Sequence, residues 1–272
     1  MLSNTVKALG RQVTGPLEYT VEVFLLIYCA CRTAIMESQQ GFRTVFGVIS
    51  MQIYFTGWQA LPLISILALS SGSVVIMQST SQLALLGGGS MIGNLMIMII
   101  FREVAPLLTA LIVIARSGTA VASEIGNMRV NREIEALEIM GIDPLSFIVF
   151  PRLVGGVVSV LCLAFYYVLI AMIGGFLVTR IFDDSPFAFY ADSIAAAFTK
   201  EDAFIFIIKN CFSGAIIFIN SCYQGLLVQQ SPHEVPQATT KAVVNSVIMV
   251  VIFNLMMTAL FYLSQLMKLG VI

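Results

Sequence analysis

The sequence predicts an all-α integral membrane protein with five transmembrane helices. Charged residues make up 11% of its 272 positions, against about 25% in a typical globular chain. Hydrophobic residues make up 58%, more than a soluble fold of this size could cover with polar surface. The charges also fall in clusters, and the apolar runs between them reach the roughly 20 residues that a helix needs to cross a bilayer.

Composition excludes several other classes of protein. A net charge of -1 gives no indication of nucleic-acid binding. The five cysteines have no zinc or redox spacing, and the single histidine, His233, lies in a Pro-rich stretch. One histidine without a paired cysteine motif argues against a metal site. We therefore expect no metal ligands in this chain.

The predicted spans follow from the gaps between charges. Residues 44–101 contain no Asp, Glu, Lys or Arg, and Gly87, Gly88 and Gly89 divide this run. Tyr54 and Trp58 stand where an interfacial aromatic belt would place them. The five expected spans are residues 59–80, 91–115, 153–179, 203–228 and 242–267.

Residues 1–55 differ from the five-helix domain, which we place at residues 56–270. The apolar run Val23–Cys31 lies between Glu22 and Arg32 and is too short to span. It is typical of an amphipathic helix in the membrane interface, and a second short helix is expected over residues 44–55. A loose tail is the alternative.

Orientation follows from Lys and Arg, which favour the cytoplasmic side. A cytoplasmic N-terminus and a periplasmic C-terminus leave Arg180, Lys200 and Lys268 outside. The periplasmic loop, at about residues 181–202, is acidic. The same topology places the following residues inside: Lys7, Arg11, Arg32, Arg43, Arg116, Arg129, Arg132, Arg152 and Lys241.

Arg102 and Glu103 are the costly feature of the second span, because a charge at the centre of a membrane helix costs roughly 2.5 to 3.5 kcal/mol on insertion scales. Neighbouring residues point about 100° apart, so at least one of the two must meet another helix or a water-filled cavity. Pro106 has no N–H, which leaves the carbonyl of Arg102 without its usual partner. The pair forms either a polar floor in a central cavity or a structural contact between helices.

Lys209 lies inside the fourth expected span and also has two interpretations. Its side chain could extend outward to the membrane surface. Alternatively, it could contact an anionic lipid headgroup in a cavity.

A short cytoplasmic helix is expected at about residues 131–141. Asn131 is a plausible N-cap, Gly141 a plausible stop, and Asp143-Pro144 prevents continuation. A short helix between two spans commonly docks a soluble partner. A solvated surface loop is the alternative.

Catalytic motifs are missing from the sequence. It contains no G-x-x-x-x-G-K-[ST] phosphate loop, so any ATP hydrolysis would belong to another chain. It also has neither a G-x-S-x-G nor an H-E-x-x-H motif. A lipid-modifying membrane enzyme and a membrane scaffold remain alternatives to a transporter.

Several motifs resemble the MlaE-type (YrbE) permeases of MCE-associated ABC transporters. The resemblance covers about residues 55–268, and Gln78 and Lys209 fall where the family has Gln and Lys. A glycine-rich run of the family is replaced here by Ser231–Pro236, which puts the shape of the loop at residues 229–237 in doubt. The motifs are Arg102-Glu103 with Pro106, Ala115–Gly118, Glu124–Gly126 with Met128-Arg129, Glu135–Leu137, Met140, Asp143-Pro144, Pro151-Arg152 and Ala238–Lys241 with Val243-Val244.

The resemblance implies a homodimer in the bacterial inner membrane. It also implies two cytoplasmic ATPase subunits that hold ATP and Mg²⁺, a periplasmic ring of MCE-domain protein, and phospholipid as substrate. No cofactor is expected in this chain. The implied lipid-cavity residues are Arg102, Glu103, Lys209 and Gln78. The implied ATPase-coupling residues are Arg129, Arg132, Glu133, Glu135, Leu137, Glu138, Met140, Asp143 and Pro144.

Overall fold

The computed structural model describes residues 19–33, 42–86, 92–183, 187–229 and 231–268. Within these ranges every regular element is a helix and no strand occurs. Five helical stretches in them are long and apolar enough to cross a membrane. The predicted all-α membrane fold with five spans is confirmed.

The first span is longer than the sequence predicted. It runs from Phe46 to Ser79 through α2 (Phe42–Thr56), the 3-10 turn η1 (Trp58–Ala60) and α3 (Leu61–Leu86). The apolar helical stretch starts before Gln59 because η1 follows α2 almost without interruption, and α2 is the second short helix expected over residues 44–55. It packs against a later membrane helix, α8.

The second span extends past its predicted end at Ala115 and reaches Val130. Buried Val121 and Ile125 anchor the extension among later helices, so packing overrides the polar character of the sequence there. Its segments are α4 (Ile92–Met96), the π-helical η3 (Ile97–Val104), α5 (Ala105–Val113), the π-helical η4 (Ile114–Gly118) and α6 (Thr119–Val130).

The short helix α7 (Glu133–Ile139) lies inside the range expected for it. Gly141 ends it at φ +76°, with Gly141 N–H donating to the Glu138 carbonyl and Ile142 N–H to the Leu137 carbonyl, the Schellman pattern. The expected N-cap is wrong: Asn131 is the C-cap of α6, and Arg132 precedes α7 in the left-handed region at φ 59°. The third span follows as η5 (Leu145–Val149) and α8 (Phe150–Asp183).

The remaining elements begin earlier than expected. The loop expected over residues 181–202 contains α9 (Phe187–Ala197), which is too short to span. Next, α10 (Lys200–Leu226) starts at a capping box in which Thr199 and Asp202 bond each other's backbone N–H. The last span, α11 (Glu234–Lys268), begins eight residues before position 242, since its Pro236 stands in the first turn, where proline is tolerated.

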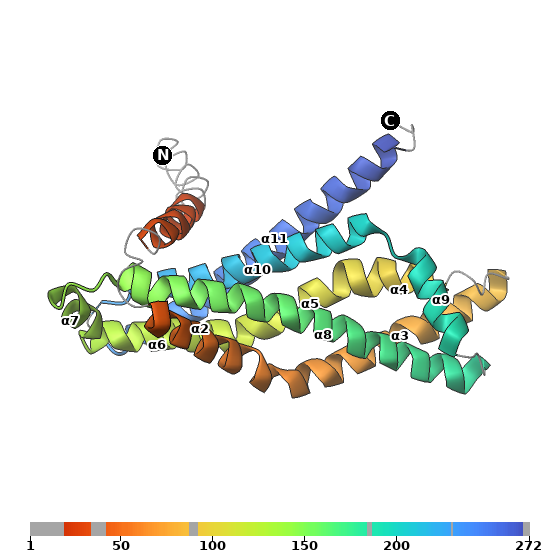
Figure 1. The fold of residues 1–272 in the computed structure, drawn as a ribbon, viewed down its shortest axis with the longest axis horizontal. Helices are drawn as coiled ribbons and strands as arrows, with labels where there is room; N and C mark the ends of the chain where they lie inside the picture. The colour runs from red at the N-terminus through yellow and green to blue at the C-terminus, as the bar shows by residue number, and fades with distance from the viewer. Residues whose placement is uncertain (1–18, 34–41, 87–91, 184–186, 230, 269–272) are drawn as a thin grey trace, which may run out of the picture.

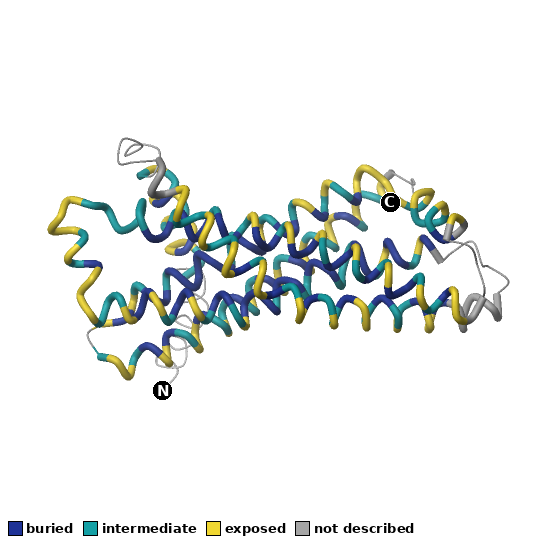
Figure 2. The backbone as a smooth tube through the Cα atoms, turned by 60° about the horizontal axis from the view of Figure 1, so that its bottom comes forward, coloured by how far each residue is buried: buried dark blue, intermediate teal, exposed yellow. Residues whose placement is uncertain are grey.

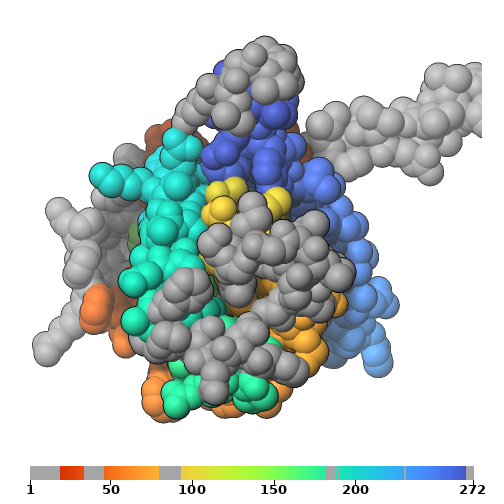
Figure 3. Space-filling model, turned by 90° about the vertical axis from the view of Figure 1, so that its right-hand side faces the viewer, coloured from red at the N-terminus to blue at the C-terminus, as the bar shows by residue number. Residues whose placement is uncertain are grey.

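The helices form an elongated bundle with α7 at one end and α9 at the other (Figure 1). The long helix α8 packs against α2, α3 and α10, and α10 packs against α6 and α11. Buried residues follow the interior of the bundle while exposed ones recur on its outer faces (Figure 2). At the far end, α9 packs on α4, and the C-terminal part of α11 diverges from the rest of the bundle (Figures 1 and 3).

The N-terminal helix over residues 19–33 has one face on α10. Tyr19 donates a hydrogen bond to the Asn220 side chain at 3.0 Å and meets the ring of Tyr223 edge-on. Its opposite face exposes apolar side chains such as Phe24 and Tyr28. This pattern agrees with the amphipathic helix that the sequence indicates.

Glycines bring α3 and α8 into backbone contact. A Cβ atom on Gly72 would stand 2.0 Å from the carbonyl oxygen of Ala171, and one on Gly174 would stand 2.5 Å from that of Leu69. Small residues at such crossings allow the close approach on which helix association in membranes depends.

We expect Gly72→Ala to destabilise the bundle by about 1–3 kcal/mol, because the added methyl group overpacks the crossing. Gly47→Ala is the matched control, since a Cβ atom there meets nothing within 4 Å and alanine favours a helix. Thermal unfolding in detergent would measure both. Equal stability of the two variants would contradict the close crossing.

Candidate functional site

Lys209 joins three segments of the chain at one buried nitrogen. Its side chain is 1% exposed. The Nζ group donates to the Arg102 carbonyl at 2.9 Å, to Glu103 Oε1 at 3.1 Å and to Thr258 Oγ1 at 2.8 Å. An ammonium group has three N–H donors, and each has a partner here. Both interpretations of Lys209 are therefore wrong: its side chain does not extend outward to the membrane surface, and its nitrogen has no free donor for a lipid headgroup.

The backbone around Arg102 explains one of these bonds. Pro106 lacks the N–H that would bond the carbonyl of residue 102 in an α-helix, and Lys209 supplies the replacement donor. Arg102 and Glu103 lie in the π-helical segment η3, and π-helical turns often occur at functional sites. The proline removes the usual donor to the Arg102 carbonyl, and the π-helical turn and Lys209 compensate for its loss.

Arg102 points to a different partner from Glu103, as neighbours on a helix should. Its Nε lies 2.7 Å from Oδ1 of Asp202, whose side chain is fully buried. The guanidinium carbon also lies 4.8 Å from the centre of the Phe261 ring, a cation–π distance. The same Asp202 caps α10, so the ion pair ties η3 to the start of that helix.

Glu103 is the accessible member of the cluster. Its side chain is 41% exposed although Lys209 binds it. Thr258 Oγ1 lies 2.9 and 3.0 Å from its two carboxylate oxygens and 2.9 Å from the Asn254 carbonyl. One hydroxyl hydrogen serves only one acceptor at a time, so the carboxylate keeps accepting capacity for a further donor.

Three of the four predicted lipid-cavity residues come together: Arg102, Glu103 and Lys209. The fourth, Gln78, is exposed on α3 and takes no part in the bonds just described. Sequence reasoning missed Asp202 and Thr258. The Thr199-x-x-Asp202 capping pattern could have moved Asp202 from the loop to a helix start, whereas nothing in the sequence marked Thr258.

The predicted coupling residues gather at the opposite end of the bundle. On α7, the side chain of Ile134 is buried and that of Leu137 is half-buried, while Glu133 and Glu138 are exposed. Ile139 is 88% exposed and Met140 65% exposed, which is unusual for large apolar side chains. The structure therefore presents a charged helix with an uncovered apolar tip.

The flanking coupling candidates have local roles. Asp143 accepts a hydrogen bond from Leu145 N–H at 3.1 Å, and Pro144 is the N-cap of η5. Arg129 and Glu135 line a pocket of about 500 Å³ with residues 226–229. The hydrogen bond of Asp143 ties the loop after α7 to the start of the third span.

Five apolar spans, a partly exposed carboxylate within them and an uncovered helix at one end define a polytopic membrane protein of the permease class. The profile of the family described as Permease MlaE matches residues 49–260. This match covers most of the chain, so the protein belongs to the MlaE permease family.

Bacterial relatives are similar over nearly their whole length, and a chloroplastic relative over part of it. A probable ABC transporter permease protein of Rickettsia bellii is 30% identical over 96% of this chain and 99% of its own. The intermembrane phospholipid transport system permease protein MlaE of Haemophilus influenzae is 26% identical over the same shares. The chloroplastic protein trigalactosyldiacylglycerol 1 of Arabidopsis thaliana is 26% identical over 78% of this chain and 60% of its own.

We expect Glu103→Gln and Lys209→Met to be strongly coupled. Glu103→Gln leaves the Lys209 charge buried without its carboxylate, and an unpaired buried charge costs about 3–5 kcal/mol, whereas Lys209→Met leaves a carboxylate that is 41% exposed. The loss of unfolding free energy in the double variant should therefore be smaller than the sum of the losses in the two single variants, by about 0.5–3 kcal/mol. Unfolding in detergent would be followed by circular dichroism, with Glu138→Gln on exposed α7 as the control. Simple additivity would contradict the pairing.

Proposed function

We propose that this chain is the membrane subunit of an ABC transporter that moves phospholipid or a related lipid between two membranes. The observation that carries the proposal is Glu103, a partly exposed carboxylate backed by Lys209 within apolar spans. A polar group among apolar walls suits a molecule with a polar head and apolar chains. The names of the Haemophilus and Rickettsia relatives support the same function.

ATP hydrolysis is assigned to separate ATPase subunits that dock on α7. The uncovered apolar tip of α7, Ile139 and Met140, supports this, since exposed apolar side chains of this size commonly mark protein contacts. The full sequence has no phosphate loop of its own. In this proposal the ATPases hold ATP and Mg²⁺, and α7 passes their movement to the spans.

The proposed assembly is a homodimer in a bacterial inner membrane, with α7 cytoplasmic and α9 facing a periplasmic MCE-domain ring. The first and last spans have surfaces that a second copy could cover. In these two spans only 28% and 22% of the apolar stretch is buried within the chain, against 44% to 56% in the other three. Exposed Ile252 and Leu255 on α11 lie on the turns before Thr258, so a partner there would enclose Glu103. The cluster of Lys and Arg at the α7 end supports the orientation.

Ile139→Asp should abolish co-purification of the ATPase, because a charge replaces the apolar contact. The chain would be expressed with its neighbouring genes, extracted in mild detergent and analysed by mass spectrometry for subunits and lipid. Ile181→Asp is the matched control, an exposed isoleucine near the opposite end. Retention of the ATPase by both variants would contradict docking on α7.

Glu103→Ala and Arg102→Ala should each lower ATP-dependent transfer of fluorescent phospholipid between membranes at least tenfold while leaving the complex assembled. The magnitude follows from losing a hydrogen bond to a charged group, about 1.5–3 kcal/mol. The assay needs the reconstituted complex, with Arg180→Gln, exposed at the α9 end of α8, as control. Loss of the dimer would instead make the cluster purely structural.

A further inference from the structure

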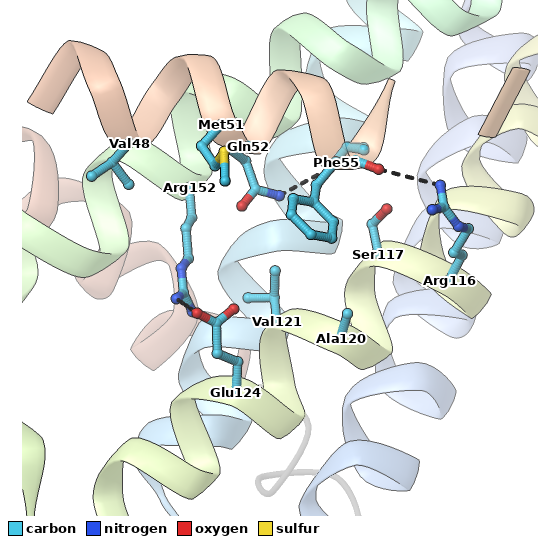
Figure 4. A pocket seen from close by; sticks show the side chains of 11 residues that line it. Val48, Met51, Gln52, Phe55, Arg116, Ser117, Ala120, Val121, Glu124 and Arg152 are labelled. Carbon is cyan, nitrogen blue, oxygen red and sulfur yellow. Dashed lines mark hydrogen bonds and ion pairs between the residues drawn. The ribbon is translucent and has the colours of Figure 1, made fainter. Parts of the chain in front are cut away.

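A second polar site lies between α2 and α6, away from Glu103. It is a pocket of about 390 Å³ to which α8 contributes Arg152 (Figure 4). We propose that this pocket binds the phosphate group of a membrane phospholipid in the leaflet at the α7 end of the bundle.

Two arginines give the pocket its capacity for an anion. Arg116 Nη1 donates to the Phe55 carbonyl at 3.2 Å, and its Nη2 bonds the Gln59 side chain. Among the described residues its partners are thus neutral oxygens rather than a carboxylate. A guanidinium has five N–H donors, so Arg116 keeps both its charge and spare donors.

Arg152 supplies the second donor group from a buried position. Its side chain is 9% exposed, and its Nη2 pairs with Glu124 Oε1 at 2.8 Å. Its Nη1 is buried and has no hydrogen-bond partner. An unpaired buried donor costs about 1–3 kcal/mol, and an oxygen of a ligand in the pocket would remove that cost.

Glu124 does not cancel this capacity. Its carboxylate is already held by Arg152, and its side chain is 62% exposed. The lining therefore carries two guanidinium groups against one carboxylate. Figure 4 draws the two guanidinium groups at opposite ends of the pocket. The phosphate would therefore bind the spare donors of Arg116, because arginine pairs favourably with phosphate, and another oxygen of the same lipid would accept from Arg152 Nη1.

The position of the pocket along the membrane normal favours a lipid headgroup as the source of that phosphate. Arg116 follows Arg102 by 14 residues, which is about 21 Å along the helix. Exposed Tyr54 and Trp58, on α2 and η1, flank the lining residues Phe55 and Thr56 in the sequence, and such aromatic side chains settle at headgroup level. The pocket thus lies at one membrane surface, and the Glu103 cluster lies deeper toward the other.

The rim of the pocket suits acyl chains. Met51 and Phe55 line it and are 60% and 53% exposed. Both lie on α2, so a lipid whose phosphate enters between α2 and α6 would lay its chains along this apolar face. A free phosphate ion would have no use for that face.

The test is affinity for dioleoylphosphatidylglycerol, titrated into the detergent-solubilised full chain with its co-purifying subunits and read by native mass spectrometry. Arg116→Gln should weaken binding at one site per chain about tenfold, in line with a lost charge-assisted bond. Ala120→Phe fills the pocket from an exposed position, keeps both arginines and should do the same. Arg180→Gln and Glu103→Gln should leave this site unchanged.

Each other outcome overturns the proposal. Unchanged affinity in Ala120→Phe would mean that the lipid does not enter the pocket, even if Arg116→Gln failed to fold. Loss of the site in Glu103→Gln would place the measured lipid at the buried cluster instead. Displacement by inorganic phosphate at the lipid's own concentration would identify an anion site without lipid selectivity.

Discussion

The constraint on which the rest of the structure depends is the burial of Lys209 among apolar helices. An ammonium group cannot remain charged there unless each N–H finds an oxygen. The three oxygens come from a backbone carbonyl and a carboxylate of the second span and from a hydroxyl of the fifth. The single nitrogen therefore fixes the fourth span against two others. Hydrocarbon supplies no hydrophobic force for that purpose, so polar contacts and close packing must do it.

The same requirement explains the irregular backbone of the second span. A regular α-helix with Pro106 would leave the Arg102 carbonyl without a donor. The π-helical η3 and the lysine resolve this together. Irregular backbone at membrane depth is tolerated where protein satisfies it. The arrangement also leaves Glu103 at the surface of the cluster, where it is held by Lys209 and Thr258 but remains able to accept from a further donor.

The sequence predicted the number of spans because the signal is one of composition: long apolar runs with few charges are unfavourable in water. It predicted less well where spans begin and end. The second span reaches Val130 because Val121 and Ile125 are buried by other helices, a tertiary effect that hydropathy does not contain. The need of Arg102 and Glu103 for partners was visible in the chain, and so was the orphaned carbonyl. Their actual partners, Asp202 and Thr258, lie about 100 and 155 positions away, and only the crossing of the helices brings them near.

Under the proposed function, the second span is long enough to transmit motion from α7 into the membrane. Its 38 residues would extend about 57 Å as a helix, well beyond the roughly 30 Å of hydrocarbon in a bilayer. It carries Glu103 at one depth, Arg116 at another, and ends next to α7. A displacement of α7 by a docked ATPase would therefore reach both polar sites through one continuous rod. The two π-helical segments, η3 and η4, hold Glu103 and Arg116 respectively. Both are places where a helix can change its pitch without losing its backbone bonds, so the rod is adjustable at the two positions that carry its polar sites.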